Sequence, residues 1–147
     1  MNDFLHKLPE FVGHHMALSA LFMVLLVALI ATHIGTLFSK VKELSPAGLT
    51  ALINRETPLL IDISPRDSFD KAHVPGSRHV AMSQFDPENK NLAKAKELPV
   101  VLICRSGQTA SKAAQRLVKA GFSHVYVLAG GMSAWQEAQL PVAKGNK

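Results

Sequence analysis

The stretch from Pro99 to Gly121 constrains the fold of this chain more than any other part of the sequence. Val100–Ile103 is an apolar and mostly β-branched run, which is typical of a strand buried on both faces. From Gln108 the apolar residues follow a helical period, and Gly121 is a favourable residue at which to end a helix. Cys104, the only cysteine in the sequence, is therefore expected at the carboxyl end of a buried strand, where a short loop opens a helix.

The expected position of Cys104 has chemical consequences. Successive N–H groups of such a loop can form a cradle for an anion, and the amino end of the helix adds a positive field. Both effects favour the thiolate over the thiol, so we expect Cys104 to be a nucleophile near neutral pH. Gly107 allows a tight turn, and Arg105 supplies a fixed cation suited to an anionic substrate. An inert buried cysteine is the alternative, but the predicted strand, loop and helix favour the reactive one.

Three motifs in the sequence resemble those of the rhodanese (sulfurtransferase) family. The loop Cys104-Arg105-Ser106-Gly107-Gln108-Thr109 is similar to the active-site loop of that family. An earlier stretch with Asp62, Phe69 and His73-Val74-Pro75-Gly76-Ser77 resembles the family's first signature, and Val125–Val142 resembles its carboxyl-terminal one. The resemblance runs from about Leu44 to Val142. Ser64 and Thr109 stand where the family often has arginine, and Ala72 replaces its usual glycine.

The resemblance implies a fold and an activity. The fold is an α/β parallel sheet flanked by helices, which agrees with the alternation of short strands and helices in the sequence. The activity is transfer of sulfane sulfur from thiosulfate or a similar small anion to a thiol or another thiophilic acceptor, through a persulfide on Cys104. The loop Arg105–Thr109 would bind the anion, whereas Asp62 and His73 would be structural supports. Neither a metal nor an organic cofactor is implied.

Two other function classes remain open from the sequence. One is a binding or regulatory module that docks at the membrane and keeps the fold with little turnover, which Ser64 and an apolar segment near the amino end suggest. The other is a phosphatase or arsenate reductase of the Cys-x5-Arg type. That chemistry needs an arginine six residues after the nucleophile, and Ala110 occupies this position. We therefore rank the phosphatase below the other two classes.

The apolar segment is the second feature that shapes the chain. Met16–Phe38 contains 23 residues without Asp, Glu, Lys or Arg, and a helix of this length spans a hydrocarbon core of about 30 Å. Its length and the lack of a small-residue cleavage site argue against a cleaved signal peptide. We expect a short tail over residues 1–15, a transmembrane helix over 16–38, a tether over 39–44 and a rhodanese-like domain over 45–143.

The charges beside the apolar segment predict its orientation. Lys7 alone precedes it, whereas Lys40 and Lys42 follow at once. The positive-inside rule then places the amino terminus outside and the main domain in the cytoplasm, on a single-pass protein of the bacterial inner membrane. A lone catalytic thiol also survives best in a reducing compartment. A periplasmic domain on an uncleaved signal anchor is the alternative.

Charge and composition narrow the range of partners. The net charge is +5, and 15 of the 16 Lys and Arg follow residue 39, against nine of the 11 Asp and Glu. This excess suits an anionic substrate or an anionic membrane surface. Nucleic-acid binding is disfavoured, because aromatic residues make up only 6% of the chain and no basic stripe is interleaved with them. A membrane protein is a further candidate partner.

The rest of the sequence predicts short alternating elements. Ser45 and Pro46 are a favourable start for a helix. Pro58–Ile63 is typical of a buried strand, with Asp62 near its end. The other expected elements are a short helix over Pro65–Ala72, strands over Arg78–Ala81 and Ser123–Leu128, and a last helix with Trp135 as a core anchor.

Overall fold

The computed structural model describes residues 13, 15–37 and 40–145, with the backbone alone described for residues 32–37. The chain divides into two compact units, Met1–Ser39 and Lys40–Lys147. The predicted tail over residues 1–15 lies largely outside the described residues, as do Phe38 and Ser39.

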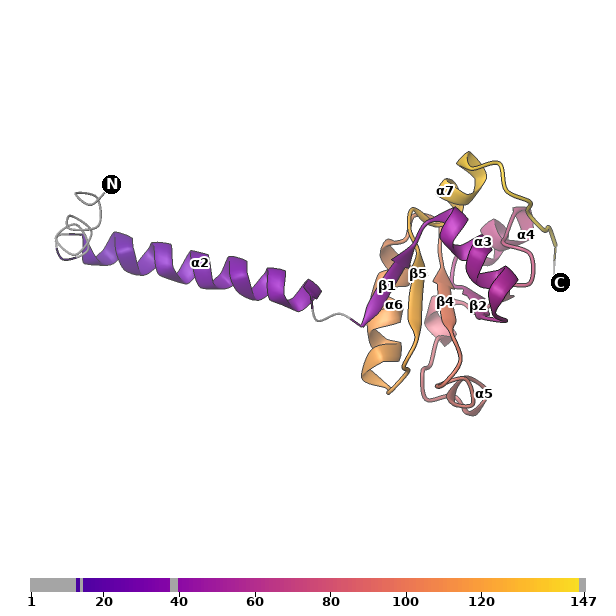
Figure 1. The fold of residues 1–147 in the computed structure, drawn as a ribbon, viewed down its shortest axis with the longest axis horizontal. Coiled ribbons are helices and arrows are strands. Elements are labelled where there is room, and N and C mark those ends of the chain that lie inside the picture. The colour runs from indigo at the N-terminus through magenta and orange to yellow at the C-terminus, as the bar shows by residue number, and fades with distance from the viewer. Residues whose placement is uncertain (1–12, 14, 38–39, 146–147) are drawn as a thin grey trace. The chain divides into compact units, whose positions relative to one another are not determined.

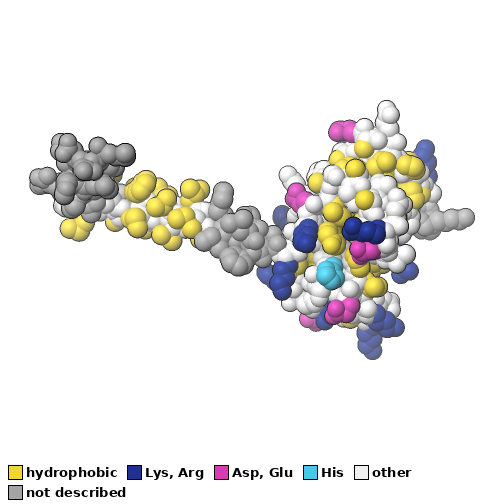
Figure 2. All heavy atoms as spheres, viewed as in Figure 1, with side chains coloured by type: hydrophobic (Ala, Val, Ile, Leu, Met, Phe, Trp, Pro, Cys, Tyr) yellow, Lys and Arg dark blue, Asp and Glu magenta, His cyan; other side chains and the backbone are white. Residues whose placement is uncertain are grey.

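The main element of the first unit is the helix α2, Met16–Leu37. Its apolar side chains between Met16 and Ile30 are exposed, and Figure 2 shows them along this helix. Within the described residues, no helix combines the length and the apolar character that crossing a membrane requires. The transmembrane helix predicted over residues 16–38 is therefore not confirmed.

The second unit is built on a parallel sheet that has five strands among the described residues. They are β1 (Val41–Leu44), β2 (Leu59–Asp62), β3 (Arg78–His79), β4 (Val100–Ile103) and β5 (Val125–Leu128), in the spatial order β1-β5-β4-β2-β3. The helices are α3 (Pro46–Arg55), α4 (Arg66–Lys71), α5 (Lys90–Ala93), α6 (Gln108–Lys119) and α7 (Gly131–Glu137), and a short 3-10 helix covers Met82–Gln84. Helical segments connect successive parallel strands (Figure 1). The α/β parallel sheet flanked by helices is thus confirmed.

The structure corrects the predicted tether. Residues 41–44 form the edge strand β1, which pairs in parallel with β5 and places Val41 opposite Val125. Lys42 and Glu43 are exposed, so the sequence of β1 shows the charges expected of a solvated segment. Short charged strands are common at sheet edges, where the backbone of the neighbouring strand supplies the pairing. The folded domain therefore begins before residue 45.

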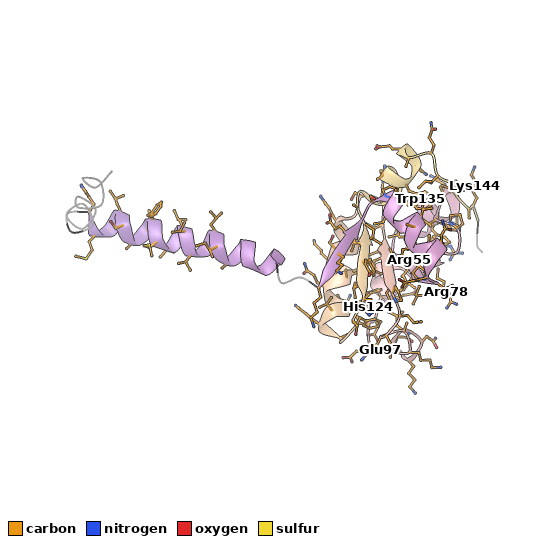
Figure 3. All side chains as sticks on the ribbon, in the orientation of Figure 1. Arg55, Arg78, Glu97, His124, Trp135 and Lys144 are labelled. Carbon is orange, nitrogen blue, oxygen red and sulfur yellow. The ribbon has the colours of Figure 1, made fainter. Side chains whose placement is uncertain are left out.

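Each face of the sheet packs against helices. One face is covered chiefly by α6, and the other by α3 and α7 (Figure 1). The residues of α6 that were predicted to share its buried face are buried or half-buried: Ala110, Ala113, Ala114, Leu117 and Val118. Trp135 on α7 is 4% exposed, and its Nε1–H donates to the Pro141 carbonyl at 2.9 Å (Figure 3). The predicted core anchor is confirmed.

The central strand positions the site. All four residues of β4 are fully buried, as predicted for Val100–Ile103. Since β4 lies between β5 and β2, the segment after Ile103 emerges at the middle of the carboxyl edge of the sheet. Open α/β sheets place their sites at this edge.

Local sequence also determines where the flanking helices begin. Ser45 caps α3 by accepting a hydrogen bond from the Gly48 N–H at 3.1 Å, and Pro46 is the first helical residue. The helix predicted over Pro65–Ala72 is α4. The strand predicted over Arg78–Ala81 is shorter than expected, because β3 contains only Arg78 and His79.

Candidate active site

Cys104 directly follows β4, and its thiol is enclosed by the loop that leads into α6. The residue is 3% exposed. Its Sγ accepts hydrogen bonds from the backbone N–H of Gly107 at 3.0 Å and of Ala110 at 3.4 Å. Two N–H dipoles directed at one sulfur can stabilise negative charge on it. The Gly107 N–H of the loop and the Ala110 N–H of α6 therefore both point at the Cys104 sulfur, and their action as an anion cradle stays a prediction.

Gly107 gives the loop its shape. Its φ is +93°, in the left-handed region that glycine enters without the steric cost of a Cβ, and it is the N-cap residue of α6. A Cβ at this position would lie 3.4 Å from both the Leu128 carbonyl oxygen and the Gly130 nitrogen. A Cβ would therefore be accommodated by ordinary van der Waals contact, and it is the positive φ of the turn that favours glycine at position 107.

The first turn of α7 supports the loop from a distant part of the chain. The Met132 N–H donates to the Cys104 carbonyl at 2.9 Å, and the Ser133 N–H donates to the Arg105 carbonyl at 3.2 Å. The Ser133 hydroxyl donates to the same Arg105 carbonyl, also at 3.2 Å. Gly131 makes this approach possible, because a Cβ there would overlap the Cys104 carbonyl oxygen. The carbonyl groups of Cys104 and Arg105 are therefore held by α7, whereas the Gly107 N–H faces the sulfur.

Cys104 lines a cavity of about 400 Å³, called here the Cys104 cavity. Its other described lining residues are Ile63, Ser64, Pro65, Ala81, Met82, Ser83, Arg105, Ser106 and Thr109. Arg105 is the only charged one among these described residues, and four of the others carry hydroxyl groups. A single cation and several hydroxyls beside a cradled sulfur suit a small anion that approaches the thiol.

The residues predicted to bind the substrate contribute in different ways. Arg105, Ser106 and Thr109 line the cavity, and Gly107 contributes its N–H. Gln108 is exposed at the start of α6 and is not among the described residues that line the cavity. The second N–H on the sulfur comes from Ala110, which the sequence analysis did not assign to the site.

Asp62 supports the cavity wall from within. It is fully buried at the end of β2, and its Oδ1 accepts hydrogen bonds from both the N–H and the hydroxyl of Ser64. Its Oδ2 has no hydrogen-bond partner among the described residues. The His79 Nε2–H donates to the Ser64 carbonyl at 2.8 Å. Ser64 is thus fixed from two sides where it lines the cavity, and it takes the place of the family's usual arginine.

His73 lies in the core instead of the cavity. It is 1% exposed, its ring stacks on Phe69 with centroids 3.8 Å apart, and its Nδ1–H donates to the Phe69 carbonyl at 2.8 Å. Its backbone also exchanges two hydrogen bonds with Ala143. These contacts are structural, and His73 is absent from the described lining of the Cys104 cavity.

The residues that reach the site from other elements have no distinctive pattern in the sequence. Backbone N–H groups make the contacts of Ala110 and Met132, and nearly every residue type has such a group. Ser133 also uses its hydroxyl, which it shares with many surface serines. The available signal was the pair Gly130-Gly131 after β5, where both glycines have positive φ. Among the described residues, no group of three His, Cys, Asp or Glu is arranged to hold a metal ion.

The chain is similar to known proteins over most of its length. The Rhodanese-like domain family matches residues 45–138. The "Uncharacterized protein YibN" of Escherichia coli strain K12 is 37% identical over 142 residues, which make up 96% of this chain and 99% of that protein. The "Thiosulfate sulfurtransferase GlpE" of Pseudoalteromonas translucida strain TAC 125 is 32% identical over 97 residues, which are 66% of this chain and 90% of that protein.

Solved structures of two proteins resemble the sheet domain. The crystal structure of thiosulfate sulfurtransferase from Pseudomonas aeruginosa has a TM-score of 0.62 at 27% identity, over 71% of this chain and 19% of that chain. The rhodanese-related protein from Thermoplasma volcanium shares the fold, with a TM-score of 0.60 at 20% identity over 69% of this chain and 97% of that one. With Cys104 in the loop at the carboxyl edge of this sheet and a family match across nearly all of the sheet domain, the chain belongs to the rhodanese-like domain family.

Proposed function

We propose that this protein is a membrane-anchored sulfurtransferase. It moves sulfane sulfur from thiosulfate, or a similar small anionic donor, to a thiol or another thiophilic acceptor. The observation that carries the proposal is the pair of N–H groups, from Gly107 and Ala110, that point at the Sγ of Cys104. The relative from Pseudoalteromonas translucida, which is named a thiosulfate sulfurtransferase, supports it.

In the first half-reaction the Cys104 thiolate attacks the outer sulfur of thiosulfate. A bond forms between Sγ and that sulfur, the S–S bond of thiosulfate breaks, and sulfite leaves with the bonding electron pair. Arg105 lines the cavity and attracts the dianion. The cradle N–H groups stabilise negative charge on the sulfur, much as an oxyanion hole stabilises oxygen.

In the second half-reaction a thiophilic acceptor attacks the terminal sulfur of the persulfide. The bond between this sulfur and Sγ breaks, and Cys104 returns to the thiolate. Donor and acceptor therefore react in turn with the same sulfur, which predicts ping-pong kinetics. The chain holds no second cysteine, so the acceptor thiol has to come from another molecule.

Mass spectrometry of the intact full-length chain in detergent tests this mechanism. Thiosulfate should add one sulfur atom to the wild type and none to Cys104→Ser, because Cys104 is the only thiol. An equal mass gain in the variant would contradict the role of Cys104. No gain in the wild type would favour a binding or regulatory module with little turnover.

Membrane anchoring is a separate part of the proposal. Residues 16–38 contain no Asp, Glu, Lys or Arg, and the described apolar side chains of α2 are exposed along consecutive positions. A helix that is apolar on all sides requires an apolar environment. Lys40 and Lys42 follow the segment at once, which favours an orientation with the rhodanese-like domain in the cytoplasm of a bacterial cell.

A further inference from the structure

A second cavity shares part of its lining with the Cys104 cavity. It has a volume of about 310 Å³ and shares Ser64 and Arg105 with the Cys104 cavity. Its other polar lining residues come from α4 and α7: Ser68, Lys71, Ser133 and Gln136. We call it the Lys71 cavity. Cavities of a few hundred Å³ with a few convergent polar groups are typical small-molecule sites. The proposed transfer of sulfur from thiosulfate to Cys104 does not use the Lys71 cavity.

Buried contacts fix the two walls of the Lys71 cavity. On the α4 side, Phe69 is 2% exposed and stacks on His73. On the α7 side, Trp135 is 4% exposed, and Ser133 donates two hydrogen bonds to the Arg105 carbonyl. The polar side chains of the cavity therefore stand on elements that are anchored in the core, so the site is largely formed before a ligand arrives.

The Lys71 cavity is positively charged. Lys71 and Arg105 are both exposed, and the side chain of neither forms an ion pair or hydrogen bond with another described residue. No Asp or Glu occurs among the described lining residues. Asp70, next to Lys71 in α4, pairs with Arg66 at 3.2 Å instead. Two cations without acidic partners, beside hydroxyl and amide groups, form a chemically suitable site for a carboxylate.

We infer that the Lys71 cavity binds the carboxylate of the sulfur acceptor, and that this acceptor is a carboxylate-bearing thiol of low molecular weight. The inference rests on the proposed sulfurtransferase function. Because Arg105 and Ser64 line both cavities, we expect one ligand to place its thiol beside Cys104 and its carboxylate near Arg105 and Lys71. Binding at a point away from the reacting sulfur orients the thiol for attack.

The chemical step is balanced without an external oxidant or reductant. The acceptor thiolate attacks the terminal sulfur of the Cys104 persulfide, and a bond forms between these two sulfurs. The bond from the terminal sulfur to Sγ breaks, and its electron pair stays on Sγ. Cys104 is again a thiolate, and the acceptor leaves as a persulfide with its carboxylate unchanged.

Lys71 also has an ordinary structural role to be separated from this one. It lies in the last turn of α4, where a cation interacts favourably with the helix dipole. Loss of that interaction would change stability and would affect all acceptors equally. A preference between acceptors with and without a carboxylate therefore isolates the proposed binding role.

The test uses the full-length chain in detergent, loaded with sulfur by thiosulfate and then freed of excess donor. Single-turnover rates are measured with N-acetylcysteine and with N-acetylcysteine amide, which differ only in the carboxylate. We expect Lys71→Gln to lower the ratio of their second-order rate constants about fivefold, as for one partly screened ion pair. Lys71→Glu should lower it further, and Lys71→Arg should restore it.

Lys112→Gln is the matched control, because Lys112 is an exposed lysine of α6 that lies outside the described lining of both cavities. It should leave the ratio at the wild-type value. The wild-type ratio should also fall as salt is added. If Lys71→Gln and Lys112→Gln give the same ratio in a chain that loads sulfur normally, the inference is wrong and the proposed function stands. If thiosulfate never loads Cys104, both fail together.

Discussion

We expect the side chain of Arg105 to determine how well the protein binds the sulfur donor. Its guanidinium is the only charge among the described residues that line the Cys104 cavity. We expect Arg105→Ala to raise the KM for thiosulfate by about ten- to a hundredfold, since one charged hydrogen bond contributes about 1.5–3 kcal/mol. Steady-state kinetics with thiosulfate and cyanide measure this effect.

Arg55→Ala is the matched control for charge. Arg55 is an exposed residue of α3 whose guanidinium lies 3.6 Å from the Glu56 carboxylate, and it does not line the Cys104 cavity (Figure 3). Its loss should leave the KM for thiosulfate unchanged. Equal KM values for Arg105→Ala and the wild type would show that the donor is held elsewhere.

Gly131 is the residue at which backbone geometry should matter most. Its φ is +57°, and an added Cβ would lie 2.6 Å from the Arg105 carbonyl carbon. Gly131→Ala should therefore displace the loop and lower the free energy of unfolding by about 1–3 kcal/mol beyond the backbone cost, with slower sulfur loading of Cys104. Urea denaturation and intact-protein mass spectrometry measure the two effects.

Gly121→Ala is the control that separates steric overlap with neighbouring atoms from the cost of a positive φ. Gly121 also has a positive φ, +95°, but no atom would lie within 4 Å of an added Cβ. Its substitution should cost only the left-handed backbone term, about 1–2 kcal/mol, and should leave sulfur loading unchanged. Similar losses of loading in the two variants would contradict the role given to α7.

At the scale of elements, the Cys104 loop is held between two helices. The N-cap residue Gly107 and Ala110 of α6 each supply one N–H to the Cys104 sulfur, and α7 supplies N–H groups to the carbonyls of Cys104 and Arg105. The two helices pack on opposite faces of the sheet. The site is thus built from both layers.

The cap of α3 gives a prediction at this scale. Ser45→Ala removes the hydrogen bond from the Gly48 N–H at 3.1 Å and should lower the free energy of unfolding by about 1 kcal/mol. Sulfur loading of Cys104 should not change. Ser123→Ala is the control, because Ser123 is exposed and its hydroxyl has no hydrogen bond to another described residue. If Ser45→Ala lowers the free energy of unfolding no more than Ser123→Ala does, the cap contributes little to stability.

At the scale of the whole molecule, the proposed anchor can be tested through membrane partitioning. Leu25 is 59% exposed on α2, in the middle of the apolar segment. An arginine at the centre of a span disfavours insertion by about 2.5–3.5 kcal/mol. We therefore expect Leu25→Arg to move the protein from the carbonate-resistant membrane fraction to the soluble fraction. Leu98→Arg, at a residue 50% exposed on the sheet domain, should leave the partitioning unchanged.

The proposed orientation needs a separate measurement. External protease added to bacterial spheroplasts should spare a carboxyl-terminal tag, because Lys40 and Lys42 favour a domain on the cytoplasmic side. Lysed spheroplasts are the control in which the tag is removed. Loss of the tag without lysis would reverse the orientation, and the donors available to Cys104 would then be periplasmic.

The sequence alone determined the centre of the fold. A buried β4, a loop with Cys104 and an amphipathic α6 follow from residues that are adjacent in the chain, because hydrophobic period and capping preferences are local properties. The same holds for the Ser45 cap and for Trp135 as a core residue. The family motifs added the prediction that Cys104 and its loop form the site.

Only the tertiary structure decided how that site is completed. Ser133 meets Arg105, 28 residues away in sequence, because β5 pairs beside β4 and brings α7 to the same edge. The role of a backbone N–H group, such as that of Ala110, cannot be recognised from residue type. The edge strand β1 forms because its backbone pairs with β5. Arg105 lines both cavities as a result of non-local packing, which residue type and spacing do not encode.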